Sequence, residues 1–236
     1  MDMYGPGSDQ VCDESEIYQA LLPLNGAKIL ELGCGKAEKT RAIAQAGKVA
    51  SITALEVDAV QHAKNLQITD LPNVHFGAGG AQDIPAADNG FDIVLMFKSL
   101  HHVPLGKMDR ALAEIRRVLK PGGLAYVSEP IFAGELNDII RLFHDEKAVR
   151  EAAFAAIRRA VESGLMEPVT QKFFSTPVAF QDFAQFEQQI LRVTHTDHQL
   201  SPELFEQVRA AFMQHMTPQG ARFATPIRVD LLRKPA

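Results

Sequence analysis

The chain has 236 residues, of which 46% are hydrophobic and 22% charged, the composition of an ordinary soluble globular protein. At this length one domain with a substantial core is expected, and we assign residues 1–236 to it. The formal net charge of −5 gives no positive field to gather nucleic acid, and no stretch approaches the length of a membrane span. With no signal-like N-terminus and only two cysteines, the sequence predicts a cytoplasmic protein without nucleic-acid or membrane partners.

Residues 1–24 are expected to form an N-terminal cap segment. Residues 1–12 contain glycine and proline, and we expect this segment to have no regular secondary structure. Asp13, with Glu16 three residues later, is a pattern that begins helices, and we expect this helix to end near Leu22.

The most informative segment is KILELGCGKAEKT, residues 28–40. A short apolar run ends in Gly33-Cys34-Gly35, and a helix-compatible stretch follows at once, which predicts a buried strand, a tight turn and a helix start. Such a turn brings backbone N–H groups close to a ligand. Glu31 precedes the glycines, and a carboxylate there suits an ammonium or sulfonium group better than a pyrophosphate.

The dinucleotide fingerprint G-x-G-x-x-G would need glycine at position 38, where this chain has Glu38. A negative side chain at a helix start disfavours a pyrophosphate further. Of the functions that we consider, a nicotinamide-dependent oxidoreductase is therefore the one with the least support from the sequence.

Strand-like and helix-like segments alternate up to residue 130, which predicts parallel strand pairing with right-handed crossovers. A ligand should then lie at the carboxyl ends of the strands. The expected strands are 28–32, 51–57, 73–76, 91–97 and 124–129, and the expected helices between them are 38–46, 59–67 and 107–119.

After Pro130 the pattern changes to a charged, alanine-rich stretch, residues 131–167, which we interpret as a helical lid or substrate cap. Two later segments, Lys172–Ala179 and Arg222–Leu232, are expected to add antiparallel strands, with helices near 181–191 and 201–215 between them. The predicted fold is α/β, a Rossmann-like, doubly wound, mostly parallel seven-stranded sheet with an antiparallel last strand and a helical insertion.

The sequence ELGCG resembles the first motif of the class I S-adenosylmethionine (SAM)-dependent methyltransferases. NVHFGAGGAQDIP, residues 73–85, resembles the third motif of that family, and the helix, Lys-Pro-Gly-Gly and strand of residues 110–130 strengthen the resemblance. The likeness is to the small-molecule branch, which includes quinone-biosynthesis methyltransferases, and it covers roughly residues 25–130. It implies SAM as the cofactor and a small molecule as the methyl acceptor.

The resemblance also implies roles for single residues. Glu31 would contact the methionine ammonium group. Glu56, about twenty residues past the glycine turn, would take the ribose diol, with Asp58 as second choice. The cofactor-binding residues expected on this basis are Glu31, Gly33, Cys34, Gly35, Glu56, Val57, Ala81, Gln82, Asp83 and Phe97.

His101 and His102 follow the fourth strand, where the transferred methyl group would lie, and are the catalytic candidates, either as general base or as contacts to substrate. The alternative is that one of them only holds the loop. Glu129, at the end of the fifth strand, could bind substrate at the same edge.

Two positions depart from the family pattern. Ala37 stands where a third glycine is usual, and alanine there costs on the order of 1 kcal/mol if the position needs positive φ. Gly80 stands where an acidic residue is frequent, so that Gln82 or Asp83 would have to accept the adenine amino group.

No metal is expected from the sequence. His195, Asp197 and His198 match no strong zinc spacing and are expected to lie in a loop between helices. The function that the sequence predicts is methyl transfer from SAM to a small molecule by in-line displacement. A non-catalytic SAM-binding protein and transfer from a modified SAM remain open, as does the oligomeric state.

Overall fold

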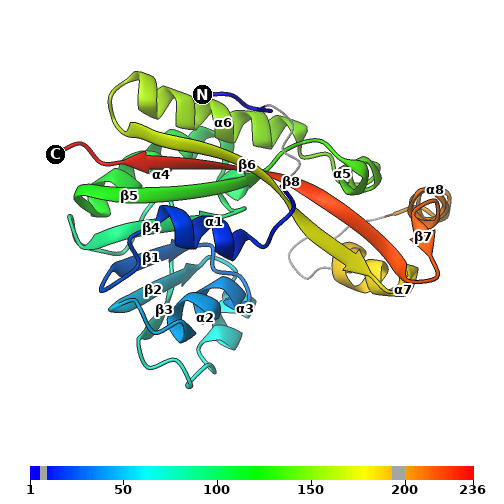
Figure 1. Ribbon diagram of the computed structural model, residues 1–236, viewed down its shortest axis with the longest axis horizontal. Helices are drawn as coiled ribbons and strands as arrows, with labels where there is room; N and C mark the ends of the chain where they lie inside the picture. The colour runs from blue at the N-terminus through cyan, green and yellow to red at the C-terminus, as the bar shows by residue number, and fades with distance from the viewer. Residues whose placement is uncertain (6–9, 193–199) are drawn as a thin grey trace.

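The computed structural model describes residues 1–5, 10–192 and 200–236, and its centre is one mixed sheet in the order β3-β2-β1-β4-β5-β8-β6 (Figure 1). The parallel half alternates with helices as the sequence predicts. Its elements are α1 (Glu14–Leu21), β1 (Lys28–Leu32), α2 (Glu38–Gln45), β2 (Ser51–Glu56), α3 (Ala59–Asn65), β3 (Val74–Ala78), β4 (Phe91–Phe97), α4 (Met108–Val118) and β5 (Leu119–Pro130). Two single 3₁₀ turns, Leu100–His102 and Leu105–Lys107, connect β4 to α4.

The C-terminal part contains α5 (Glu135–Ile140), α6 (Lys147–Glu162), β6 (Glu167–Phe180), α7 (Phe183–Phe186), a π-helical turn (Glu187–Leu191), α8 (Pro202–Met213), β7 (Met216–Thr217) and β8 (Gly220–Arg233). Strand β8 lies between β5 and β6 and is antiparallel to both. The Rossmann-like architecture and the antiparallel addition are therefore confirmed. The expected strand number is one too low, because the two-residue strand β7 also pairs with β8.

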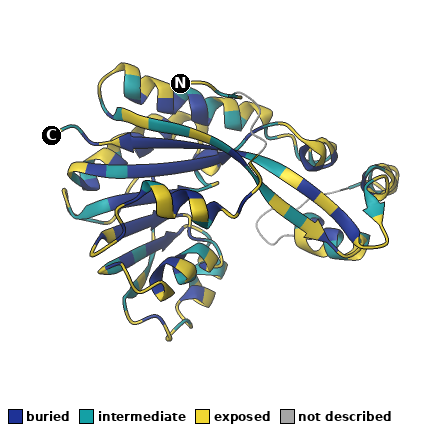
Figure 2. Cartoon of the chain, viewed as in Figure 1, coloured by how far each residue is buried: buried dark blue, intermediate teal, exposed yellow. Residues whose placement is uncertain are grey.

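Alternation of side chains along the strands produces a core on each face of the sheet. In β1, Leu30 packs in the core that contains α4 and α6, whereas Ile29 packs in the core that contains α1 and α2. Both side chains are completely buried, and Figure 2 shows the central strands as the most buried part of the fold.

Segment 131–167 divides into two parts with different surroundings. Helix α6 packs Ala153, Ala156 and Ile157 into the same core as α4 and covers the sheet as a crossover helix between β5 and β6. Helix α5 instead packs Leu136 and Ile139 into a third hydrophobic cluster.

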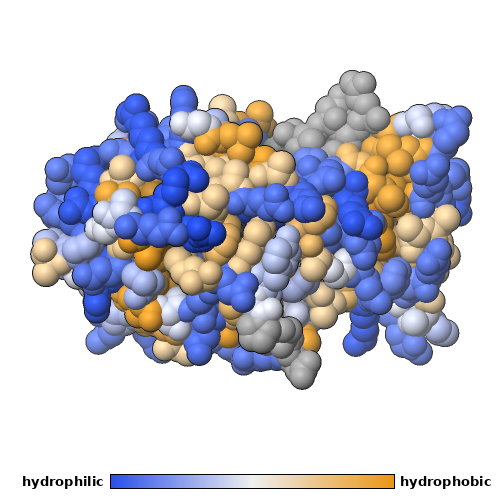
Figure 3. Space-filling view, turned by 90° about the horizontal axis from the view of Figure 1, so that it is seen from above, coloured by the Kyte–Doolittle hydropathy of each residue, from blue (hydrophilic) through white to orange (hydrophobic). Residues whose placement is uncertain are grey.

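That third cluster belongs to an arm that extends away from the main sheet (Figure 1). Pairing between β5 and β8 ends at Pro130–Ile227, while β6 and β8 continue as a two-stranded ribbon to Phe180–Ala221. Helices α5, α7 and α8 pack on this ribbon around Phe180, Phe186 and Phe212. We call this unit the distal arm, and hydrophobic side chains remain visible at its end of the molecule in Figure 3.

His195, Asp197 and His198 lie outside the described residues, so their prediction stays open. In the part of the chain that the structure describes, no helix is both long and apolar enough to cross a membrane.

Candidate active site

A cavity of about 510 Å³ opens at the carboxyl ends of β1, β2 and β4, which is the edge where the sequence places the ligand. This volume falls in the range of small-molecule sites. The predicted residues that line it are Gly33, Gly35, Glu56, Val57, Ala81, Gln82, Phe97 and His102. Four other predicted residues, Glu31, Cys34, Asp83 and His101, do not form part of its wall.

The glycine turn after β1 has the conformation that glycine permits. Gly33 has φ of +73°, and a Cβ there would meet Cβ of Ser99 at 2.9 Å. Gly35 has φ of +52°, but a Cβ there would meet nothing within 4 Å. Gly33 is thus required by packing, whereas Gly35 borders open space in the cavity and leaves the backbone accessible to a ligand.

Ala37 also has a left-handed backbone, with φ of 60° and ψ of 27°. The position that is usually a third glycine therefore needs positive φ, and this chain tolerates the strain of an alanine there, on the order of 1 kcal/mol.

Glu56 ends β2 and is only 7% exposed. Its Oε2 accepts a hydrogen bond from the backbone N–H of Gly35 at 2.7 Å, and its Oε1 accepts from Val57 and Asp58 at 2.8 and 2.9 Å. Three backbone donors fix the carboxylate at the cavity wall. Each oxygen has two lone-pair directions, so that one direction on Oε2 remains for a hydroxyl donor of a ligand.

Glu31 lies behind the glycine turn, 2% exposed, and accepts a hydrogen bond from Oγ1 of Thr40 at 2.6 Å. Burial raises the pKa of this carboxyl to about 7, although the bond from Thr40 and the charge of Lys39 oppose the shift. Its protonation therefore changes close to neutral pH.

Cys34 is buried, and the amide of Asn65 donates to its sulfur at 3.4 Å. Burial, reinforced by the negative charges of Glu31 and Glu56, raises the pKa of the Cys34 thiol to about 12. The thiol is therefore not a nucleophile at neutral pH.

The loop after β3 forms the opposite wall of the cavity. Gly80 and Asp83 form an isolated bridge, and the N–H of Asp83 donates to the carbonyl of Gly80 at 3.1 Å. Gln82 lines the cavity, and a Cβ at Gly80 would lie 2.8 Å from its amide group. Of the two expected acceptors for an adenine amino group, Gln82 is therefore the one at the cavity.

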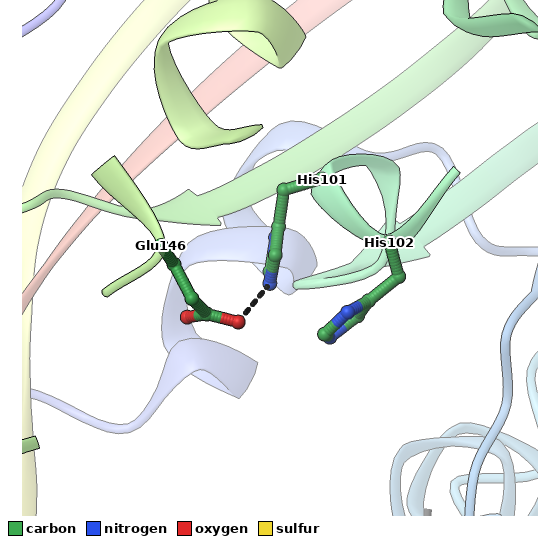
Figure 4. Close-up of side chains that lie close together, drawn as sticks. All are labelled: His101, His102 and Glu146. Atoms are coloured by element: carbon green, nitrogen blue, oxygen red, sulfur yellow. Dashed lines mark ion pairs between the residues drawn. The ribbon is translucent and has the colours of Figure 1, made fainter. Parts of the chain in front are cut away.

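The two histidines occupy different positions (Figure 4). His102 lines the cavity, whereas His101 is 5% exposed and lies behind it. Nδ1 of His101 lies 2.5 Å from Oε2 of Glu129, whose Oε1 accepts the N–H of Leu100 at 2.9 Å. Glu129 is thus buried against His101 and is not in the cavity wall.

Sequence reasoning missed two lysines in the wall, Lys36 in the glycine turn and Lys98 directly after β4. Lys98 has φ of +53°, a conformation that is uncommon outside glycine, and its N–H donates to the carbonyl of Ser128 at 2.8 Å. Nothing in the sequence pattern signals that backbone conformation.

Comparison with known proteins decides the family. A model described as a methyltransferase domain matches residues 29–123. An uncharacterized methyltransferase of Synechocystis sp. is 31% identical over 156 residues, which cover 59% of this chain and 72% of that protein. The chain belongs to the class I SAM-dependent methyltransferases.

Other curated methyltransferases match over a shorter part. A demethylmenaquinone methyltransferase of Staphylococcus epidermidis is 36% identical over 106 residues, or 44% of this chain and 43% of that protein. The chain spans less than half the length of several curated relatives that it matches, between 36% and 45%.

The solved structure of the YcgJ protein from Bacillus subtilis superposes with a TM-score of 0.67 at 15% identity, covering 94% of this methyltransferase and 97% of that chain. The similarity at this low identity concerns the fold, which extends well beyond the residues that the family model matches.

Proposed function

We propose that this methyltransferase binds SAM in the cavity at the carboxyl ends of β1, β2 and β4 and methylates a small molecule there. The observation that carries the proposal is Glu56, a buried carboxylate at the cavity wall beside Gly35, whose missing side chain leaves open space. A carboxylate at the end of the second strand is the group that binds a ribose diol in this type of fold.

The other walls fit the remaining parts of SAM. Gln82 and the backbone at Ala81 provide a donor and acceptors for an adenine edge. Glu31 lies behind the glycine turn, and its charged form would attract an ammonium group of SAM through a buried, weakly screened path. Lys36 offers a positive charge to a carboxylate.

The acceptor side of the cavity is expected around Phe97, Lys98 and His102, which follow one another at the end of β4. Phe97 provides an apolar surface, and its ring packs at 5.8 Å from that of Tyr18 in the N-terminal segment. We expect His102 either to contact the acceptor or to act as its general base. His101, held by Glu129, positions this turn.

Bound SAM supplies an electrophilic methyl group on a positively charged sulfur. The chain then needs only to align the acceptor in line with the methyl group and to exclude water. Within segment 131–167, α6 packs against the sheet and cannot cover the cavity as a cap. We therefore propose a substrate cap only for the residues before α6.

Calorimetric titration with SAM and with its demethylated product tests the proposal. Native protein should bind both in the micromolar range, and Glu56→Ala should weaken binding by at least roughly tenfold, which corresponds to about 1.4 kcal/mol. Glu162→Ala, an exposed acid at the end of α6, is the matched control and should bind as the native protein does.

Failure of folded native protein to bind either compound would overturn the proposal. If the protein binds SAM but transfers no methyl group to any acceptor, it would be a non-catalytic SAM-binding protein. Tighter binding of a SAM analogue that lacks the carboxylate would indicate that the cofactor is a modified SAM.

A further inference from the structure

His101, His102 and Glu146 present three metal-binding atoms, one from each residue, that lie within 4.8 Å of one another (Figure 4). The first two residues come from the turn after β4, and Glu146 immediately precedes α6. Two imidazole nitrogens and one carboxylate oxygen form a ligand set used for divalent transition metals.

The bond between His101 and Glu129 fixes the direction of the first ligand. A carboxylate only accepts, so the Nδ1–H of His101 donates to Oε2 of Glu129 at 2.5 Å, and the lone pair of a neutral ring is then on Nε2. This arrangement, in which a carboxylate holds the far nitrogen of a histidine, is typical of histidines that bind metal.

Nε2 of His101 faces Oε1 of Glu146 at 3.6 Å. Two ligands of one tetrahedral ion, with bonds of about 2.1 Å, are separated by roughly 3.4 Å. The spacing of these two atoms is therefore compatible with a metal ion bound by both.

Glu146 is held in place by groups that leave this direction available. Arg150 donates from Nη2 to Oε2 of Glu146 at 2.6 Å, which engages the other oxygen. Nε2 of His144 lies 3.0 Å from Oε1 and uses one of its lone pairs. The carboxylates of Glu129 and Glu146 would attract a cation, and the guanidinium of Arg150 offsets part of their charge.

We propose that His101, His102 and Glu146 bind a divalent transition-metal ion, with Glu129 orienting His101. Three protein ligands leave a position for an exchangeable group. Because His102 lines the cavity, this position is adjacent to the space where the acceptor is expected.

The role of the ion rests on the proposed function, whereas its binding does not. An ion held by His101, His102 and Glu146 would lower the pKa of an acceptor hydroxyl bound to it, so that the hydroxyl would release its proton to solvent before the site closes for methyl transfer. The resulting oxygen then forms the new bond to the methyl carbon while the carbon–sulfur bond breaks. The acceptor class implied is an enol, phenol or other ionisable hydroxyl compound.

The test uses Co²⁺ as the probe, added without SAM to full-length protein that has been treated with a chelator. One equivalent should bind and produce visible absorption bands of a four- or five-coordinate ion, and Zn²⁺ should displace it. Both His102→Gln and Glu146→Gln should abolish these bands. Glu129→Gln should weaken Co²⁺ binding roughly 10- to 100-fold through the orientation of His101.

His215→Gln is the matched control, because His215 also pairs with a glutamate, Glu135 at 3.8 Å, but in the distal arm. Its Co²⁺ spectrum should equal that of the native protein. Thermal unfolding of each variant excludes loss of the fold as the cause.

Absence of Co²⁺ binding by native protein would overturn the proposal, and so would bands that persist in both His102→Gln and Glu146→Gln. Titration with SAM on the same samples reports the proposed function separately. If the protein binds Co²⁺ but not SAM, the proposed metal site stands and its proposed role in methyl transfer is wrong.

Discussion

At the scale of single residues, the two acids at the ends of β1 and β2, Glu31 and Glu56, differ in their environment. Glu56 receives three backbone N–H donors at the cavity wall, whereas Glu31 is buried behind the turn and receives one hydroxyl donor. The sequence alone predicts an acid at each strand end. It does not predict which of them faces the cavity, because that depends on how the glycine turn folds over Glu31.

Stability near neutral pH should depend on Glu31. Its pKa in the folded protein is raised to about 7 from an ordinary value of 4.5. The folded state therefore binds the proton more tightly, and this contribution to stability is present below pH 4.5 and lost as the pH rises through 7, by about 3 kcal/mol.

Glu31→Gln keeps an oxygen for Thr40 but does not titrate. Urea unfolding at pH 5 and pH 8 should therefore show the variant gaining stability relative to the native protein as the pH rises. A stability difference that is the same at both pH values would contradict this assignment.

Gly35 can be tested against a second glycine of similar backbone. Gly26 and Gly35 have φ of +70° and +52°, and a Cβ at either would meet nothing within 4 Å. Alanine at each position should cost roughly 1 to 2 kcal/mol of stability from left-handed strain. Only Gly35→Ala places a methyl group at the proposed SAM site, and it should weaken SAM binding at least about tenfold.

Chemical denaturation and calorimetry measure the two effects on the same samples. Equal SAM affinity in Gly26→Ala and Gly35→Ala would mean that the ligand does not approach the turn at Gly35.

At the scale of secondary-structure elements, the hydrophobic periodicity of the sequence and its glycine and proline breaks are sufficient to predict the strands and helices of the parallel half. Apolar runs such as Phe91–Phe97 are strands, and the apolar stripe of α4 is buried as expected, with Met108, Leu112 and Ile115 in the core. Local patterns succeed there because strands and helices alternate regularly along the chain, and such alternation is typical of a parallel sheet.

Segment 131–167 shows where local patterns are insufficient. Its helical spacing is correct, but the same spacing fits a lid and a helix buried against a sheet. The outcome for α6 was decided by the long-range position of β6, which requires a crossover from β5. The cluster of His101, Glu129 and Glu146 was not predicted for the same reason, because the two acids are 28 and 45 residues away from the histidine along the chain.

At the scale of the whole molecule, the distal arm has its own aromatic core, connected to the main sheet through the β6–β8 ribbon. Phe212 is completely buried there and packs on the ring of Phe186 at 4.8 Å. Phe212→Ala should remove about 3 to 5 kcal/mol of packing from the arm.

Because the arm has its own hydrophobic cluster and joins the main sheet through the β6–β8 ribbon, we expect the effect to remain local. Amide exchange should accelerate in α8 and the outer ribbon, while exchange in β1 and β4 and the affinity for SAM stay unchanged. Equal acceleration throughout the sheet would show that the arm and the sheet unfold as one unit.

The position of β8 between β5 and β6 also sets the order in which the protein can form during synthesis. The sheet from β3 to β5 contains only segments that follow one another along the chain, so that it can assemble as it leaves the ribosome. Strand β6 emerges next, but its long ladder is made with β8. This ladder cannot form until residues 181–233 have also been translated. During that interval the nascent chain carries a fourteen-residue strand without its β8 partner, and the free edge of such a strand can pair with another chain.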